Sequence, residues 1–393
     1  MPKRSKKYLS RREWLARTTL LACGTLFFGL DQTILGQTHD YLAGARFIGV
    51  IPFVGEPNQI MDRPVFEELD GRLLTDLSTI GQSSRVIPTE IFYIRSRASK
   101  LLKYGQPWSI KITWPEGSVD LPIEKLLAES YSMGVHLMEC SGNTIEGHFG
   151  MIGTAAWSGV PFSRILEPLK MAGRPGRILV SGFDTYVTKS RTSIPGASWI
   201  FSVDDLINVG AFLATHMNGK PLTLDHGSPV RLFVPHWYGC ASIKWVNEIS
   251  VVDENAEATS QMKEYAGRTM QKGVPRLAKD YEPALIDPAA MPIRIEKWHI
   301  NERTVYRVVG LLWGGLRTVD NLLIRFNPND PYVRVGQKYP VIEDSWTFWT
   351  HVWQPKKTGT YRIRLKIDEP PLRTRRLDMG FYDRSVTITE PSV

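Results

Sequence analysis

The stretch that decides the fold runs from residue 136 to residue 160. It begins His136-Leu137-Met138-Glu139-Cys140-Ser141-Gly142-Asn143 and continues, six residues later, Gly150-Met151-Ile152-Gly153-Thr154-Ala155-Ala156-Trp157-Ser158-Gly159-Val160. The first part predicts a buried strand that ends near Glu139, and a glycine-rich loop from Ser141 to Gly153 follows it. A cysteine at a strand end is held rigidly, and its thiolate is a soft metal donor. The neighbouring glycines let backbone amides approach a bulky anion, so we expect Cys140 at a ligand cleft.

Two other interpretations of Cys140 remain open from the residues alone. A free cysteine is often simply a buried core residue, and in an oxidising compartment Cys140 could form a disulfide with Cys240. The chain has three cysteines, of which Cys23 lies in the N-terminal apolar stretch. Two cysteines are too few for a disulfide framework.

A second informative segment lies further along the chain. It reads Asp225-His226-Gly227-Ser228-Pro229-Val230-Arg231-Leu232, followed by Val234-Pro235-His236-Trp237-Tyr238-Gly239-Cys240-Ala241-Ser242-Ile243-Lys244-Trp245. An arginine fork binds phosphate in two places at once, and backbone amides add further donors. The alternatives to a ligand-binding role are that His226 is a hydrogen-bonded histidine in a turn and that Arg231 is a surface residue of a strand.

Together these segments resemble the sulfite oxidase family of molybdopterin-dependent oxidoreductases, over about residues 85 to 390. The resemblance implies a molybdenum–molybdopterin cofactor, with Cys140 as the protein's own ligand to the metal. It also implies a set of residues that hold the pterin and its phosphate: Arg97, Asp184, His226, Arg231, Ser242, Ile243 and Lys244.

The same resemblance assigns two residues to the substrate. Arg95, within Phe92-Tyr93-Ile94-Arg95-Ser96-Arg97, takes the place of the family's anion-binding arginine, and Tyr265 takes that of its active-site tyrosine. The alternatives are a salt bridge at a strand end for Arg95 and an exposed interdomain tyrosine for Tyr265. The implied reaction is oxidation of sulfite to sulfate by oxygen-atom transfer, with a small anion as substrate.

Departures from the family pattern bear on the substrate. Thr144 and Ile145 stand where the sulfite enzymes commonly carry arginines, and Arg97 replaces a histidine. Two rival functions on the same scaffold therefore stay open, a sulfoxide reductase and a thiosulfate-pathway sulfane dehydrogenase. A rival from another class is a cofactor-free periplasmic binding protein.

The pattern of apolar and turn residues predicts an α+β molybdopterin-binding domain followed by an immunoglobulin-like β-sandwich. Strand-like runs cover 91–112, and short helices are expected at 123–127 and 162–171. The expected boundaries are a leader at 1–35, a lead-in at 36–84, the cofactor domain at 85–255, a connecting segment at 256–290 and the sandwich at 291–393. In the family this last domain is used for dimerisation, which is compatible with a homodimer.

The N-terminus resembles a twin-arginine export signal, Ser10-Arg11-Arg12-Glu13-Trp14-Leu15. That route exports proteins already folded around a cofactor, so the motif predicts a periplasmic location and contact with the export machinery. The apolar run from Leu20 to Leu35 is interrupted by glycines and an aspartate, which makes it a poor membrane helix. An uncleaved leader acting as a membrane anchor and a lipoprotein box at Cys23 are the alternatives.

Composition bounds the partners of the chain. Its 393 residues are 42% hydrophobic and 22% charged, with a formal net charge of +8. Part of that excess lies in the first 17 residues, and no basic stripe is interleaved with aromatics, which argues against nucleic-acid binding. The sequence contains no Cys-x-x-Cys-His haem attachment, so we expect no haem in this chain and a separate c-type cytochrome or haem subunit as electron acceptor.

Overall fold

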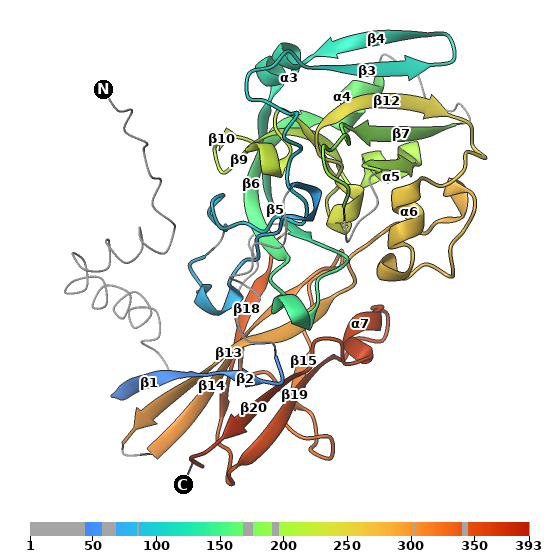
Figure 1. Ribbon diagram of the computed structural model, residues 1–393. Coiled ribbons are helices and arrows are strands. Elements are labelled where there is room, and N and C mark those ends of the chain that lie inside the picture. The colour runs from blue at the N-terminus through green and yellow to red at the C-terminus, as the bar shows by residue number, and fades with distance from the viewer. Residues whose placement is uncertain are drawn as a thin grey trace, which may run out of the picture.

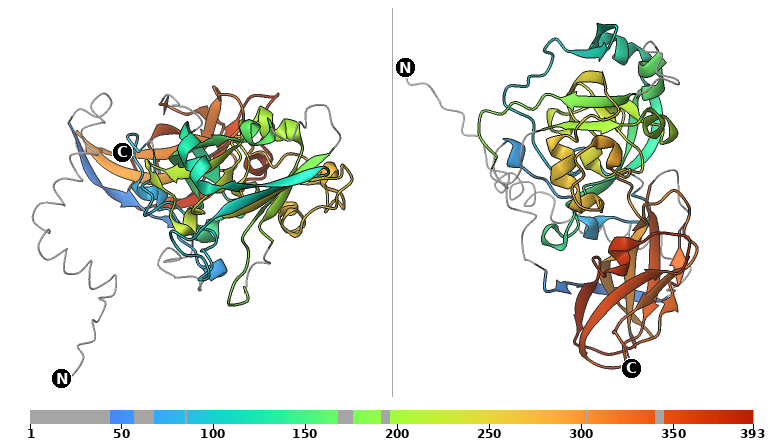
Figure 2. Two further views of the ribbon diagram at one scale, coloured as in Figure 1. Left: turned by 90° about the horizontal axis from the view of Figure 1, so that it is seen from above. Right: turned by 90° about the vertical axis from the view of Figure 1, so that its right-hand side faces the viewer.

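The computed structural model describes residues 44–56, 68–84, 86–167, 176–190, 196–301, 303–339 and 345–392. It has two lobes, which Figures 1 and 2 show one beyond the other along the molecule. The first lobe contains most of residues 68–280, and the second contains β1, β2 and the strands from β13 onward. The expected leader at 1–35, with its export motif, lies outside the described residues.

Two five-stranded sheets build the first lobe. One has the order β10-β9-β6-β5, with β11 beside β9, and the other has the order β4-β3-β12-β7-β8. The strands of the first sheet are β5 (Tyr131–Glu139), β6 (Ile152–Pro161), β9 (Phe212–Met217), β10 (Lys220–Pro221) and β11 (Arg231–Phe233). Those of the second are β3 (Ser109–Trp114), β4 (Gly117–Pro122), β7 (Arg177–Gly182), β8 (Ser198–Phe201) and β12 (Val246–Val252).

Short helices connect these strands: α3 (Ile123–Glu129), α4 (Phe162–Leu166), α5 (Val203–Asn208) and α6 (Ser260–Tyr265). The described chain is therefore mostly β-structure, with less helix than an α+β prediction implies. Aromatic side chains fill the core behind β6, where Trp157 contacts Phe233 with ring centroids 4.8 Å apart and Phe212 stacks on Phe233 at 5.1 Å. Such fully buried rings contribute most to holding these strands in place.

The second lobe consists of two further five-stranded sheets, with orders β1-β13-β14-β18-β17 and β16-β15-β19-β20-β2. The first contains β1 (Ala45–Ile51), β13 (Ala289–Ile300), β14 (Arg303–Trp313), β17 (Gln337–Lys338) and β18 (Thr347–Trp353). The second contains β2 (Phe53–Val54), β15 (Leu322–Arg325), β16 (Val333–Arg334), β19 (Gly359–Ile367) and β20 (Arg384–Ile388), with α7 (Arg375–Asp378) between the last two long strands. Its assignment to the immunoglobulin type stays a prediction.

The lead-in segment belongs partly to this second lobe. β1 and β2 form edge strands of its two sheets, although more than 230 residues separate them from β13. An ion pair stabilises the contact between the lead-in segment and the second lobe. Arg384 Nε donates to Glu56 Oε1 at 2.6 Å, and both side chains are almost fully buried. The sequence pattern places no such strands in the lead-in, because pairing partners so distant leave no local signal.

Several element predictions can be compared with the structure. The strand expected to end near Glu139 is confirmed as β5, and the helix expected after Pro122 is α3. The helix expected at 162–171 is shorter, since α4 ends at Leu166 and residues 168–175 are outside the described residues. The strand-like reading of 91–112 is wrong for 91–108, where only a single bridge joins Ile94 to Leu73. Backbone carbonyls there accept from side chains of the cavity described below, which replaces strand pairing.

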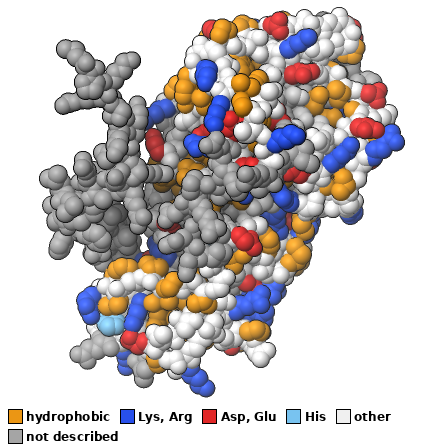
Figure 3. All heavy atoms as spheres, viewed as in Figure 1, with side chains coloured by type: hydrophobic (Ala, Val, Ile, Leu, Met, Phe, Trp, Pro, Cys, Tyr) orange, Lys and Arg blue, Asp and Glu red, His pale blue; other side chains and the backbone are white. Residues whose placement is uncertain are grey.

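Within the described residues, no helix combines the length and apolar character required to cross a membrane. Figure 3 shows Lys and Arg side chains scattered among acidic and hydrophobic ones over one face of the molecule.

Candidate active site

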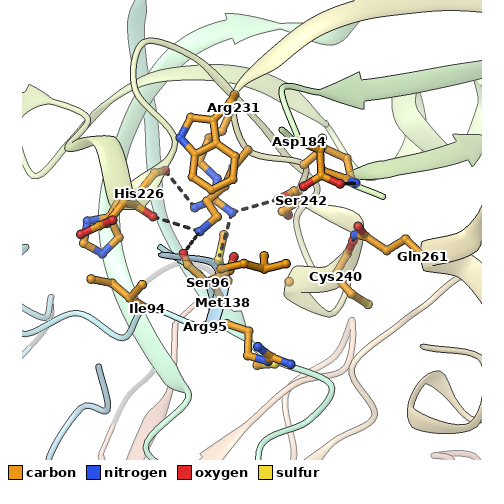
Figure 4. A pocket seen from close by; sticks show the side chains of 18 of the residues that line it. Ile94, Arg95, Ser96, Met138, Asp184, His226, Arg231, Cys240, Ser242 and Gln261 are labelled. Atoms are coloured by element: carbon orange, nitrogen blue, oxygen red, sulfur yellow. Dashed lines mark hydrogen bonds between the residues drawn. The ribbon is translucent and has the colours of Figure 1, made fainter. Parts of the chain in front are cut away.

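A cavity opens where strand ends and loops of the first lobe meet. Figure 4 shows His226 and Asp184 on opposite sides of it, with Arg231 entering between them and Arg95 at the other end. Nine of the ten predicted site residues line this cavity: Arg95, Cys140, Asp184, His226, Arg231, Ser242, Ile243, Lys244 and Tyr265. Residues from distant parts of the sequence thus converge on one space.

Cys140 follows β5 directly and is 5% exposed, yet its side chain contributes to the cavity wall. Its backbone amide donates to the carbonyl of Met151 at 2.9 Å, which closes the loop between β5 and β6. Asn143 braces the loop from inside, because its Nδ2 donates to Glu139 Oε1 at 3.3 Å and its Oδ1 accepts from the Met151 amide at 2.9 Å. Both Cys140 and Cys240 are free thiols, so the alternative of a disulfide between them does not hold here.

Arg231, on β11, occupies the middle of the cavity and is 4% exposed. Its Nη1 donates to the carbonyl of His226 at 3.2 Å, and its Nη2 donates to the carbonyl of Ser242 at 3.0 Å. Among the described residues, its buried Nε has no hydrogen-bond partner. Burial lowers the pKa of Arg231 to about 10, so the side chain stays cationic at neutral pH.

Lys244 adds a second cation beside Arg231. Its Nζ donates to the carbonyls of Ser96 and Asp225, at 2.5 and 3.0 Å, and lies 4.5 Å from the ring centre of Trp245. Burial and then the charge of Arg231 lower the pKa of Lys244 to about 7. Cations depress each other's pKa when no anion lies between them, so this part of the cavity is prepared for a negative ligand.

His226 completes the cluster as a neutral group. Its Nδ1 lies 2.7 Å from Thr223 Oγ1, and its Nε2 lies 3.4 Å from the carbonyl oxygen of Phe92. Burial first, then the charges of Lys244 and Arg231, lower its pKa to about 4. It is therefore an uncharged hydrogen-bonding group at neutral pH, and it lines the cavity from a short turn in which both ring nitrogens have partners.

Arg97 is placed differently from the prediction. It is the one predicted residue outside the cavity lining, and its guanidinium donates to Asp225 Oδ2 through both Nε and Nη2 at 3.2 Å. The same carboxylate accepts from the backbone amide of Ala98 at 2.8 Å. Arg97 thus pairs with Asp225 from outside the cavity, while the charge of Asp225 still acts to raise the pKa of Lys244. Its predicted direct contact with a cofactor is not supported by this geometry.

The side chains of Asp184 and Ser242 mainly accept hydrogen bonds from backbone amides. Asp184 accepts from the amide of Ala197 at 3.0 Å, and burial raises its pKa. Ser242 Oγ accepts from the amide of Val234 at 3.1 Å while its carbonyl holds Arg231. Ile243 contributes an apolar wall. These residues shape the cavity and fix the position of Arg231.

Arg95 and Tyr265 lie on the side of the cavity near the Cys140 loop. Tyr265 ends α6, is 9% exposed, and has the Arg268 guanidinium 5.2 Å from its ring centre. Burial raises the pKa of Tyr265, so its hydroxyl remains protonated. Tyr265 is thus a wall residue of the cavity rather than an exposed interdomain tyrosine.

The residues of the cavity wall that were not predicted include Tyr93, Met138, Cys240 and Gln261. Burial raises the pKa of the Cys240 thiol to about 12, which keeps it neutral and inert. Gln261 Nε2 donates to the carbonyl of Cys240 at 2.5 Å, tying α6 to this loop. Such contacts carry no local sequence signal, since their partners lie on separate elements.

These residues fit a molybdenum–pterin group. The orphaned Nε of Arg231 and the neighbouring Lys244 offer donors and positive charge to an anionic ligand. Gly239 leaves space, because a Cβ there would lie 3.1 Å from Tyr93 Oη and 3.3 Å from Met138 Cγ. No cluster of three or more His, Cys, Asp or Glu occurs among the residues that the structure describes. The free thiols of Cys140 and Cys240 both line the cavity.

Comparison with known proteins agrees with this geometry. Residues 102–260 match the model of the oxidoreductase molybdopterin binding domain. The chain is 29% identical to the mitochondrial sulfite oxidase of Macaca fascicularis over 227 residues, which are 52% of this chain and 39% of that protein. It is 30% identical to nitrate reductase (NADH) 1 of Arabidopsis thaliana over 204 residues, 46% of this chain and 21% of that protein. The chain therefore covers well under half the length of these relatives.

A likeness in fold extends further. The crystal structure of the sulfane dehydrogenase SoxCD from Paracoccus pantotrophus superposes with a TM-score of 0.61, at 16% identity, over 88% of this chain and 87% of that one. Both lobes therefore share in the likeness. With the domain match and the sulfite oxidase relatives, we conclude that residues 102–260 form an oxidoreductase molybdopterin binding domain and that the chain is a molybdopterin-dependent oxidoreductase similar to the sulfite oxidases.

Proposed function

We propose that the chain is a molybdopterin-dependent oxidoreductase that oxidises a small anionic sulfur compound, with sulfite as the first candidate. One observation carries the proposal: the Cys140 thiol, the cationic cluster of Arg231 and Lys244, and the pair Arg95 and Tyr265 all line one cavity. A binding protein without a cofactor would not need a free thiol and an excess of buried cations in the same space.

In this proposal, Cys140 is the protein's ligand to molybdenum, and Arg231 and Lys244 hold the anionic end of the pterin. The bound molybdenum–pterin supplies the two-electron redox chemistry. His226 stays neutral and is oriented by Thr223, so that it offers a hydrogen bond without adding charge. Burial of these residues excludes water, which strengthens each of their electrostatic contacts.

Arg95 and Tyr265 act on the substrate in this proposal. The guanidinium of Arg95 neutralises and orients an incoming oxyanion, since a planar fork matches two oxygens at once. The Tyr265 hydroxyl, kept protonated by burial, donates a hydrogen bond to a substrate oxygen. Both contributions are electrostatic, and each removed contact is expected to slow the reaction by roughly 100-fold.

A second candidate is oxidation of another sulfur compound, such as a protein-bound sulfane or thiosulfate. The loop after Cys140 supports this second candidate, because Ile145 packs against the hydrophobic core and brings no positive charge to the substrate site. The likeness in fold to a sulfane dehydrogenase is compatible with this candidate. A sulfoxide reductase on the same scaffold is a third outcome of the same experiment.

The test uses protein matured in a host that makes the molybdenum cofactor. Elemental analysis and pterin fluorescence should find molybdenum and pterin in the purified protein, and their absence would refute the proposal. Sulfite-dependent and thiosulfate-dependent reduction of cytochrome c are then compared with reduction of methionine sulfoxide by a reduced viologen dye. We expect Arg95→Met to retain molybdenum and lose about 100-fold in kcat/KM. Turnover near the wild-type value would remove Arg95 from the mechanism.

The electron acceptor and the location also belong to this proposal. We propose a separate c-type cytochrome or haem subunit as acceptor, since the chain contains no haem-attachment motif. The motif Ser10-Arg11-Arg12 supports export by the twin-arginine route to the periplasm, where such acceptors occur. A homodimer through the second lobe is consistent with the family resemblance.

A further inference from the structure

Glu139 is a buried carboxylate that directly precedes Cys140 in the chain. It is the last residue of β5 and is 0% exposed. Met138 and Cys140 both line the cavity, and successive side chains of an extended chain point to opposite sides. Glu139, which lies between them, therefore points away from the cavity and toward the second lobe.

Three side chains donate hydrogen bonds to the Glu139 carboxylate. Trp313 Nε1, at the end of β14, donates to Oε2 at 2.8 Å, and Tyr382 Oη, just before β20, donates to Oε1 at 3.4 Å. Asn143, in the loop after Cys140, donates to Oε1 through its Nδ2 at 3.3 Å. Burying a carboxylate is costly unless its oxygens are hydrogen-bonded. Both oxygens of Glu139 have donors, and two of these three donors come from the second lobe.

The two donors from the second lobe pack against each other and against the Cys140 loop. The rings of Trp313 and Tyr382 meet edge to face with their centroids 5.2 Å apart, and the ring of Phe149 in the loop lies 5.4 Å from that of Tyr382. All three side chains are buried. Close packing of this kind restricts the rotamers that each ring can adopt. The second lobe therefore sets the position of the Glu139 carboxylate.

The backbone on the other side of Glu139 is held by the Cys140 loop itself. The amide of Cys140 donates to the carbonyl of Met151 at 2.9 Å, and the amide of Asn143 donates to the carbonyl of Cys140 at 2.9 Å. The amide of Gly142 donates to Cys140 Sγ at 3.4 Å. Because the direction of a side chain follows from its backbone, the anchored Glu139 helps to determine where the Cys140 sulfur points in the cavity.

We infer that Glu139 is a positioning residue for the Cys140 sulfur, and that through it the second lobe fixes the direction from which this sulfur meets a bound metal. Groups hydrogen-bonded around a metal ligand orient that ligand and tune the metal. Glu139 acts through Cys140 and touches neither substrate nor cofactor. The inference deepens the proposed function and rests on it only for the presence of molybdenum, since the contacts that carry it belong to the chain itself.

Glu296 in the second lobe provides a matched control. It is 1% exposed and, like Glu139, accepts from a tryptophan, with Trp298 Nε1 donating to its Oε2 at 3.1 Å. It also accepts from Arg294 Nε and Arg307 Nε, each at 2.7 Å. These partners lie on β13 and β14. Glu296→Leu should therefore destabilise the fold, as Glu139→Leu does, without moving the Cys140 sulfur.

The first experiment measures the rate at which iodoacetamide alkylates Cys140 in the cofactor-free protein, by mass spectrometry. Glu139→Leu should raise this rate about tenfold, because the loop opens more often once its buried hydrogen bonds to residue 139 are lost. Glu139→Gln keeps one accepting oxygen and should stay closer to wild type. Trp313→Phe should also raise the rate but add little to Glu139→Leu, since the two residues act through one contact. An unchanged rate in Glu139→Leu, or an equal rise in Glu296→Leu, would overturn the inference.

Spectroscopy of the molybdenum-loaded protein then tests the metal–sulfur bond. We expect Glu139→Leu and Trp313→Phe to shift the electron paramagnetic resonance g values of the one-electron-reduced metal and the thiolate-to-metal absorption band, at unchanged molybdenum content. Glu139→Gln should restore most of the wild-type spectrum, and Glu296→Leu should match wild type. A wild-type spectrum in Glu139→Leu would overturn the inference. A protein that takes up no molybdenum would refute the proposed function, whereas the alkylation rates would still test the role of Glu139.

Discussion

His226 illustrates how a single residue is tuned by what surrounds it. Its imidazole is 4% exposed and lies near two cations, Lys244 and Arg231. Both burial and those charges disfavour the protonated ring, which explains the pKa of about 4. Protonation of this buried ring is therefore unfavourable in the folded protein. It should lower the free energy of unfolding of the cofactor-free protein.

This pKa leads to a prediction about acid stability. The folded-state pKa of about 4 lies below the unfolded value of 6.5, so below pH 6.5 the unfolded chain binds more protons than the folded chain. The contribution of His226 to stability is therefore present above pH 6.5 and is lost as the pH falls toward 4, by roughly 2–3 kcal/mol in all. Urea unfolding of the cofactor-free protein between pH 4 and 7 measures it. His226→Gln should flatten this part of the curve, and an unchanged pH profile in that variant would contradict the prediction.

The sequence predicted the individual residues of the site better than it predicted the contacts between them. Cys140, His226, Arg231 and Lys244 stand in short local motifs, and the structure brings all four to one cavity. Arg97 has the same local setting but points to Asp225, 128 positions away in the sequence. That partner cannot be derived from spacing, because it depends on long-range pairing.

At the scale of elements, α7 connects the second lobe to the Cys140 loop. Arg376 on this helix is 6% exposed, and its Nη2 donates to the carbonyls of Ser141 and Arg268 at 2.7 and 2.6 Å. Trp313 Nε1, from β14, donates to Glu139 Oε2 at 2.8 Å on the other side of the cysteine. The residues on both sides of Cys140 are thus held by the second lobe.

Removing the Arg376 contact should loosen this connection. We expect Arg376→Met to lower the free energy of unfolding by about 3 kcal/mol, since two buried carbonyls and the charge near Glu139 lose their partner. Arg276→Met serves as the control, because Arg276 pairs with Glu257 at an exposed site and should change stability by about 0.5 kcal/mol or less. Urea unfolding of the three proteins checks this, and equal losses in both variants would argue against a special role for α7.

The edge strands of the lead-in provide another prediction for elements. Glu56 follows β2, forms the buried pair with Arg384, and lies 3.1 Å from His148 Nδ1 in the Cys140 loop. Glu56→Gln leaves the Arg384 charge without a partner and should destabilise the protein by roughly 3 kcal/mol. The loss should persist at high salt, because buried charges are poorly screened. Glu254→Gln, at a partly exposed pair with Arg177, should have a much smaller effect.

The sequence predicted helices and strands whose hydrophobic pattern is local. It missed those whose form depends on contacts with distant parts of the chain. The residues expected to form the sandwich, 291–393, contain the strands from β14 to β20 and most of β13. The expected start at 291 falls inside β13, because this strand begins at Ala289 with a nearly continuous buried run that includes Pro292. Residues 91–108 have strand-like composition, but their carbonyls serve His226 and Lys244, which favours an irregular cavity wall.

At the scale of the whole molecule, direct contacts join the second lobe to the wall of the cavity. The lead-in adds strands to the second lobe and a wall to the cavity, and α7 reaches back to the loop that carries Cys140. Burial and the neighbouring Arg231 lower the pKa of Lys244, so an anionic cofactor bound beside these two cations should raise the stability of the entire fold. A ligand that binds only the folded state stabilises it in proportion to the logarithm of its concentration over Kd.

The central claim is that the Cys140 sulfur binds molybdenum at this cavity. Molybdenum K-edge X-ray absorption counts the sulfur neighbours of the metal directly in the purified holoprotein. We predict that Cys140→Ser retains the pterin but shows one sulfur neighbour fewer than wild type, whereas Cys240→Ser is identical to wild type. An unchanged sulfur count in Cys140→Ser, or a lost sulfur in Cys240→Ser, would contradict the claim.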